Sequence, residues 1–193
     1  MIPNPCTDVV IDIETLSTDV TSGAVIQIGV CFFDAEAEEF QYKSMSARLY
    51  NPDGIPDQST LDWWDTQDKQ LLNYLKDPCL YPNVKDTLLA TVDLFHDWEP
   101  KRVWANSPSF DLSFLRNLFN SADLDTPWTY KQECDVRTLR TLELCDSPSN
   151  HEMLSFKPEG TSTELWIQHN GQYDAVYEAY EVHSAVSAIG LSK

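Results

Sequence analysis

The segment DVVIDIETLST, residues 8–18, is the part of the sequence from which the fold is inferred. Four of its first seven residues are Val or Ile, as in a strand that is buried on both faces. Asp12 and Glu14 interrupt this apolar run, and residues two apart in a strand project from the same face. The sequence therefore predicts a core strand that carries two acids side by side.

Two adjacent acids in a partly apolar strand need a counter-charge. They repel each other, and each loses much of its hydration free energy when it is buried without a partner. The neighbouring sequence contains no Lys or Arg. Because hard cations prefer carboxylate oxygens, a divalent metal ion is the natural counter-charge.

Composition alone offers a competing explanation for the pair. With 31 acids among 193 residues, about five pairs of acids two positions apart are expected by chance. Most of the other pairs lie in turn-like or loop-like sequence, whereas 12/14 lies in a strongly β-branched run. Taken by itself, the pair leaves both explanations open. The other pairs are 34/36, 36/38, 97/99, 123/125 and 133/135.

The bulk properties restrict the class of protein. The 193 residues are 42% hydrophobic and contain no repeat or linker, which predicts one domain over 1–193. No long apolar stretch or signal sequence is evident, and the five cysteines form no CxxC pair, so a cytoplasmic protein without a zinc site or membrane contact is expected. The net charge of −18 argues against a broad phosphate-binding face, but not against a small groove assisted by metal ions.

The hydrophobic pattern predicts an α/β protein with a mixed sheet. Three early strands with short connections indicate an antiparallel meander, and the later alternation of strands and helices places helices on both faces. Ser59 is the expected N-cap of the first helix and Asn83 that of the second. The expected strands are 8–14, 23–34, 39–50, 102–106 and the start of 134–139. The expected helices are 59–67, 83–95, 111–119, the end of 134–139 and 172–189, with a polar loop at 146–162.

Two further motifs are weak individually. Asp111 stands at the start of a predicted helix just after a strand, where an acid is commonly an N-cap or a first-turn residue. His169 precedes Asp174 by five positions, with Gly171 between them. A histidine in a loop is usually solvated, and Asp174 has the same first-turn explanation. The order of all three motifs in one domain is much less expected by chance.

This combination resembles the DEDDh class of 3′-5′ exonucleases, whose fold is that of ribonuclease H. The segments STLDWWDTQ (59–67), SFD (109–111) and CDVRTL (134–139) are similar to the exonuclease A family of the T-even phages and its bacterial exoribonuclease-like relatives. The resemblance covers residues 8 to 189. It implies a ribonuclease H-like sheet, with the three-strand meander flanked by helices.

The resemblance also implies a catalytic site. Asp12, Glu14, Asp111 and Asp174 would hold two divalent metal ions, Mg²⁺ or Mn²⁺, and His169 would act as the general base. Suggested substrate contacts share a position close to these motifs. For Trp63 a core or lid role is favoured, and for Arg137 ordinary surface charge or helix capping is at least as well supported. The suggested contacts are Thr15, Leu16, Trp63, Asn106, Phe110 and Arg137.

The expected function is a metal-dependent 3′-5′ exonuclease that releases nucleoside 5′-monophosphates from a nucleic acid with a free 3′ end. DNA is favoured over RNA, and single-stranded or short substrates over long duplexes. The alternative is a non-catalytic acidic protein on a nuclease fold, which mimics or binds nucleic acid. A ribonuclease H-type endonuclease would share the metals but would not need His169 at this spacing. If the chain is phage-encoded, its location is the host cytoplasm, and its oligomeric state is unknown.

Overall fold

A five-stranded sheet in the order β3-β2-β1-β4-β5 organises the chain. The computed structural model describes residues 6–49, 51, 53–77 and 83–190. β1–β2 and β2–β3 are antiparallel, whereas β1–β4 and β4–β5 are parallel, which confirms the predicted meander and mixed sheet. The strands are β1 (Asp8–Thr15), β2 (Val25–Phe33), β3 (Tyr42–Arg48), β4 (Arg102–Ala105) and β5 (Glu133–Asp135).

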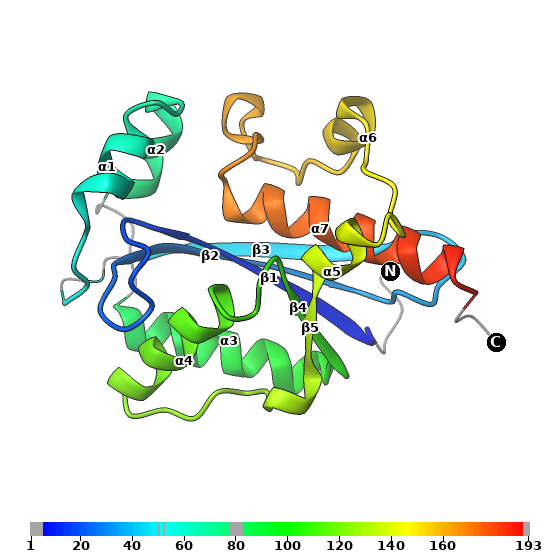
Figure 1. Ribbon diagram of the computed structural model, residues 1–193, viewed down its shortest axis with the longest axis horizontal. Coiled ribbons are helices and arrows are strands. Elements are labelled where there is room, and N and C mark those ends of the chain that lie inside the picture. Colours follow the sequence, from blue (N-terminus) through cyan, green and yellow to red (C-terminus); the bar gives the residue numbers. More distant parts are fainter. Residues whose placement is uncertain (1–5, 50, 52, 78–82, 191–193) are drawn as a thin grey trace.

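Helices cover both faces of this sheet, as predicted. In Figure 1, α3 and α4 lie on one face, and α7 lies on the other with α6 beyond it. No helix in the described ranges is long and apolar enough to cross a membrane. The helices are α1 (Gln58–Trp64), α2 (Lys69–Lys76), α3 (Val84–Trp98), α4 (Asp111–Ser121), α5 (Val136–Thr141), α6 (Asn150–Ser155) and α7 (Gly171–Ala188).

The alternation of side chains along β1 separates two cores. Val9 and Ile11 pack with α3 and α4, whereas Val10 packs with α7 on the opposite face. Asp12 and Glu14 share the face of Val10, because residues two apart in a strand point the same way. The acids of β1 therefore lie on the side of the sheet that α7 covers.

The first turn of α7 is held against β2 at very short range. A Cβ added to Gly29 would lie only 2.0 Å from the carbonyl oxygen of Gly171, so only glycine permits this approach. The buried Gln27 accepts a hydrogen bond from the Gly171 N–H (2.8 Å) and donates one to Asn170 Oδ1 (3.1 Å). Because Gly29 is the cross-strand partner of Asp12, this docking brings the start of α7 beside the acids of β1.

The predicted cap of the first helix is wrong. Asp57 is the N-cap of α1, and its carboxylate accepts from the Thr60 N–H at 2.7 Å. Ser59 lies inside the helix, and its hydroxyl donates to Asp57 at 2.6 Å. A charged acceptor forms a stronger hydrogen bond than a hydroxyl, so the aspartate takes the capping position. The predicted Asn83 cap of α3 is confirmed, since Asn83 Oδ1 accepts from the Asp86 N–H.

Two short helices were not predicted. Asp68 caps α2, whose Leu71 and Leu75 are buried. The predicted polar loop at 146–162 contains α6, which Ser149 and Glu152 begin with a reciprocal capping box. Both are shorter than the helices that hydrophobic periodicity detects well. Residues 1–5 and residue 50, at the end of the predicted third strand, lie outside the described residues.

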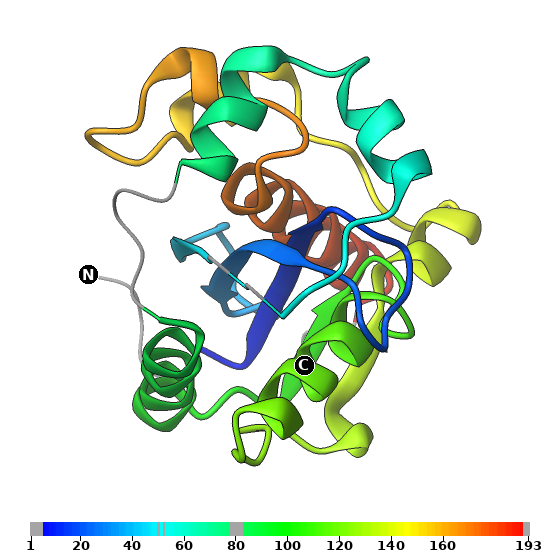
Figure 2. The same cartoon turned by 90° about the vertical axis from the view of Figure 1, so that its left-hand side faces the viewer.

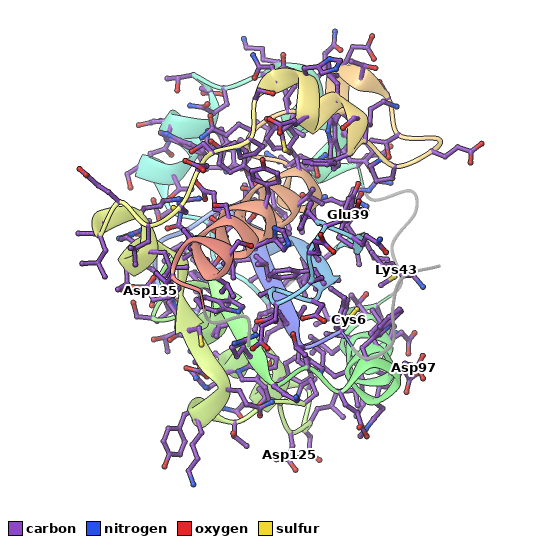
Figure 3. All side chains as sticks on the ribbon, turned by 90° about the vertical axis from the view of Figure 1, so that its right-hand side faces the viewer. Cys6, Glu39, Lys43, Asp97, Asp125 and Asp135 are labelled. Carbon is purple, nitrogen blue, oxygen red and sulfur yellow. The ribbon has the colours of Figure 1, made fainter. Side chains whose placement is uncertain are left out.

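The acidic surplus lies largely at the surface. Asp97 and Asp125 are exposed and project from the edges of the molecule in Figure 3. Asp8, at the start of β1, is an exception, because it is fully buried. Its carboxylate accepts from Arg102 Nε (2.6 Å) and Nη2 (2.9 Å) and from Trp104 Nε1 (2.7 Å). These bonds join β1 to β4 and satisfy a charge that would otherwise be costly to bury.

We expect Asp8→Ala to lower the free energy of unfolding by about 3 kcal/mol, because it leaves Arg102 and Trp104 without their buried acceptor. Glu36→Ala is the matched control, since Glu36 pairs with the same Arg102 at 3.4 Å but is exposed. Its cost should be below about 1 kcal/mol. Urea denaturation of both variants measures the difference, and equal losses would contradict a special role for the buried pair.

Candidate active site

Three of the predicted acids meet at one point. Asp12 and Glu14 from β1 and Asp174 from the first turn of α7 have ligand oxygens within 4.8 Å of one another. Asp111 begins α4 after a connection of five residues from the end of β4, and its Oδ1 accepts from the Ile13 N–H at 3.3 Å. All four line one cavity of about 870 Å³. Asp111 is not part of the tightest group.

The start of α7 positions both Asp174 and His169. Asn170 caps the helix by accepting from the Gln172 N–H at 3.1 Å. The backbone N–H of His169 donates to Asp174 Oδ2 at 2.7 Å. His169 has a φ of 68°, in the left-handed region that few residues other than glycine adopt. The HxxxxD spacing thus corresponds to a turn in which the Asp174 carboxylate accepts a hydrogen bond from the backbone of His169.

Helices α1 and α2 lie beside the segment that precedes α7, as Figure 2 shows. A small apolar cluster formed by Trp64, Leu71 and Leu75, with Leu165 packed against it, makes this contact. The ring of His169 stands edge-on to Trp63, with centroids 4.8 Å apart. The ring of His169 therefore packs against the adjacent tryptophans Trp63 and Trp64 of α1.

The adjacent tryptophans have different environments, as their divergence on a helix predicts. Trp64 is 1% exposed, and its Nε1 donates to the Thr15 carbonyl at 2.8 Å. Trp63 is 41% exposed and lines a second cavity of about 380 Å³ with Thr15 and Phe110. Trp64 is thus a core residue, and Trp63 has a ring surface open to the solvent.

The remaining predicted contacts divide into two groups. Asn106 and Phe110 line the main cavity, and Phe110 also lines the second one. Leu16 lines neither and packs instead against the apolar cluster around Trp64. Arg137 is exposed and lies outside the cavity walls, with Nη2 3.5 Å from the Asn106 carbonyl oxygen. Burial raises the pKa of Asp111, and the charge of Arg137 offsets a small part of this rise by favouring the ionised carboxylate.

The cavity holds an excess of negative charge, with Glu14 and Asp111 buried and Asp12 and Asp174 half-buried. Burial, followed by repulsion from neighbouring acids, raises the pKa values of Asp12 and Glu14 well above their usual range. Burial likewise raises the pKa values of Asp111 and Asp174 to about 7. Arg140 is the one Lys or Arg among the described residues that line the cavity. Converging carboxylates with little compensating charge have the donor chemistry that fits a hard divalent cation.

The sequence reasoning missed three acids that line this cavity, Glu143, Glu178 and Glu181, of which Glu178 lies nearest in sequence to Asp174. Glu178 follows Asp174 by one helical turn on α7, is 3% exposed and lines the same cavity. The i, i+4 spacing places both acids on one helix face, and this spacing was the available signal. Arg140 from α5 reaches Glu178 at 3.3 Å and also pairs with Glu181.

The chain is similar in structure to solved structures of exonuclease I. A product-bound exonuclease I aligns at a TM-score of 0.59 and 15% identity, covering 95% of this chain and 43% of the other. Apo exonuclease I gives 0.61 and 17%, covering 93% and 41%. A metal-free complex of E. coli ExoI with single-stranded DNA gives 0.59 and 15%, covering 96% and 40%. These likenesses establish the fold, and the chain spans about two fifths of the length of those proteins.

The sequence itself identifies the family. The family model described as "3'-5' exoribonuclease Rv2179c-like domain" matches residues 7–186, which is nearly the whole chain. The chain therefore belongs to this Rv2179c-like 3′-5′ exoribonuclease domain family. No curated protein matches the chain significantly.

The buried acids predict an unusual pH dependence of stability without metal. Each has a higher pKa in the folded chain than in the unfolded one, so the unfolded chain releases its proton first as the pH rises. In EDTA, the free energy of unfolding should fall by about 2 kcal/mol or more between about pH 5 and about pH 7.5. Added Mg²⁺ or Mn²⁺ should reverse most of this fall in a denaturation experiment.

Two variants test the origin of this pH effect. Asp12→Asn should reduce the fall, because it removes one of the repelling charges. Asp97→Asn is the control, since Asp97 and Glu99 form a pair with the same spacing but are exposed. An identical pH dependence in both variants would place the effect in the general acidity of the chain.

Proposed function

We propose that this chain is a metal-dependent 3′-5′ exonuclease that hydrolyses single-stranded nucleic acid from a free 3′ end and releases nucleoside 5′-monophosphates. The observation that carries the proposal is the convergence of Asp12, Glu14 and Asp174 oxygens within 4.8 Å, in a cavity that also receives His169. Membership of the 3′-5′ exoribonuclease family supports it.

The carboxylates of Asp12, Glu14, Asp111 and Asp174 are the proposed holders of two divalent ions. When bound, Mg²⁺ or Mn²⁺ supplies activation of the attacking water and stabilisation of the leaving 3′ oxygen. The side chains converge from three separate elements, β1, α4 and α7, so their relative positions are fixed by the sheet and the helices packed on it. Such a rigid arrangement favours reaction by fixing the geometry before substrate arrives.

His169 is the proposed general base. Its side chain lines the cavity, so its imidazole can take a proton from a water near the carboxylates. Burial lowers its pKa, and the ring is therefore neutral and able to accept a proton at neutral pH. Contact with Trp63 and the constrained backbone at φ 68° limit the positions that the ring can adopt.

The cavities favour a short single-stranded segment as substrate. Volumes of about 870 and 380 Å³ are in the range that encloses one small-molecule ligand each, which suits terminal nucleotides rather than a duplex. The exposed ring of Trp63 offers a stacking surface for a base, with Thr15 and Phe110 beside it. Asn106 offers a polar contact in the main cavity.

The choice between ribose and deoxyribose in the substrate requires a direct comparison of RNA with DNA. The family description names an exoribonuclease, whereas solved exonuclease I complexes of the same fold contain single-stranded DNA. The preference for DNA expected from the sequence stays a prediction. We therefore propose single-stranded 3′ ends as the substrate class.

The activity is tested with 5′-labelled DNA and RNA oligomers in Mg²⁺, Mn²⁺ or EDTA. A ladder that shortens from the 3′ end should appear with metal and be lost in EDTA. Asp12→Asn should lower the rate by about a thousandfold, because it removes a charge that holds the metal. Asp97→Asn, from the exposed pair of the same spacing, should retain the wild-type rate. If the folded protein shortens neither polymer, a nucleic-acid-binding role replaces the enzyme.

His169→Asn tests the general base. Asparagine tolerates the left-handed backbone at this position, so the hydrogen bond from the backbone to Asp174 is preserved. We expect kcat to fall by about a hundredfold or more with the Mn²⁺ affinity unchanged.

The pH profile gives a second readout of His169. The wild-type rate should rise with pH through the lowered histidine pKa, because only neutral imidazole accepts a proton. This part of the acidic limb should disappear in His169→Asn. An unchanged kcat, with an unchanged limb, would exclude His169 as the base.

A further inference from the structure

Glu178 has an arrangement that the proposed four-carboxylate site does not use. Its carboxylate is buried in α7, one turn after Asp174, and lines the main cavity. Oε1 accepts from Arg140 Nη2 at 3.3 Å, but Oε2 makes no hydrogen bond within the described part of the chain. Across the same part of the chain, Asn106 Oδ1 is the one other buried side-chain oxygen or nitrogen in this condition, and it lines the same cavity.

A purely structural role does not account for Glu178. Arg140 is already paired with Glu181, whose Oε2 accepts from Arg140 Nε at 2.8 Å. The other oxygen of Glu181 is occupied by the Ser147 hydroxyl at 3.2 Å. Glu181 is therefore fully bonded, whereas Glu178 adds a second buried charge with a free oxygen. Such an oxygen costs folding free energy and calls for a functional explanation.

The charge of Glu178 faces the acidic cluster. Its carboxylate contributes to the raised pKa of Asp12, and Asp111 and Asp174 in turn contribute to the raised pKa of Glu178, after the larger effect of burial. Yet Glu178 is not one of the residues whose oxygens all lie within 4.8 Å of one another. Glu178 is thus close enough to interact electrostatically with an ion held by the cluster, although it is not part of the tightest group of ligand oxygens.

We propose that Glu178 is a positioning residue of the metal site, whose free Oε2 accepts a hydrogen bond from the hydration shell of the bound cation while Arg140 holds Oε1. This inference rests on the metal dependence of the proposed function. Mg²⁺ sheds its waters reluctantly and keeps several of them in protein sites, so acceptors beyond its direct ligands matter. Such outer partners orient the site and strengthen its affinity for metal.

Arg140 fixes the orientation of the Glu178 carboxylate. By binding Oε1 of Glu178 and Oε2 of Glu181, the guanidinium fixes the Glu178 carboxylate and offsets part of its charge. The fixed carboxylate keeps its other oxygen buried, without a hydrogen bond, in a residue that lines the cavity. Arg140 thereby acts on the site through Glu178.

The test measures Mn²⁺ affinity by titration calorimetry, together with the thermal midpoint in EDTA, for the whole chain and two variants. Glu178→Gln keeps the size of the side chain and should weaken Mn²⁺ binding about tenfold. Glu181→Gln is the matched control, because it removes the same charge from the other partner of Arg140. Its Mn²⁺ affinity should stay within about twofold of the wild type, since it has no oxygen free for the ion.

Each result has a defined meaning. Equal Mn²⁺ affinities in the wild type and Glu178→Gln would overturn the inference and leave the proposed exonuclease intact. Glu178→Gln could instead lose thermal stability in EDTA, or fail to fold, while any measurable Mn²⁺ affinity is retained. That result would show that Glu178 serves the fold, and it would also overturn the inference. A wild-type chain that binds no Mn²⁺ would reject the metal dependence of the proposed function, and this inference with it.

Discussion

The contact between the start of α7 and β2 is the constraint on which the site depends. Gly29 has no side chain where Gly171 passes, and the buried Gln27 ties the same turn to the sheet. With the helix at this distance, Asp174 reaches the acids of β1. A larger residue at position 29 would push α7 outward, and the acids would separate even though each remained in the chain. The geometry of the site is therefore set by backbone packing and only secondarily by the acids.

The repulsion among the acids of the cavity destabilises the folded chain, in contrast to the paired charges elsewhere in the fold. Elsewhere buried charge is matched, as with Asp8, which is surrounded by donors from Arg102 and Trp104. In the cavity the acids are brought together with a single neighbouring guanidinium, and their pKa values rise. A cation that binds the folded chain would convert this repulsion into attraction. Folding and cation binding are then linked, as in any site built from like charges.

How much the sequence could predict depended on how local each signal was. β1, β2 and the acid pair were predictable because the β-branched run and its period are local, and Asn83 because a cap acts within one turn. The choice of Asp57 over Ser59 depended on competition between two capping groups two residues apart, which a pattern does not rank. Glu178 was missed because an acid on an amphipathic helix looks solvated until the sheet beneath it is known. The exclusion of Leu16 from the cavity is likewise a tertiary effect.

The alternation of residues along β1 has a consequence for folding fidelity. Val9, Ile11 and Ile13 face one core, while Val10 shares its face with the two acids. If the strand paired with β2 one residue out of step, every side chain would change face. Asp12 and Glu14 would then enter the apolar layer beneath α3 and α4, and two isoleucines would line the polar cavity. The same carboxylates that form the site thus penalise misregistered pairing and help the chain to select a single sheet.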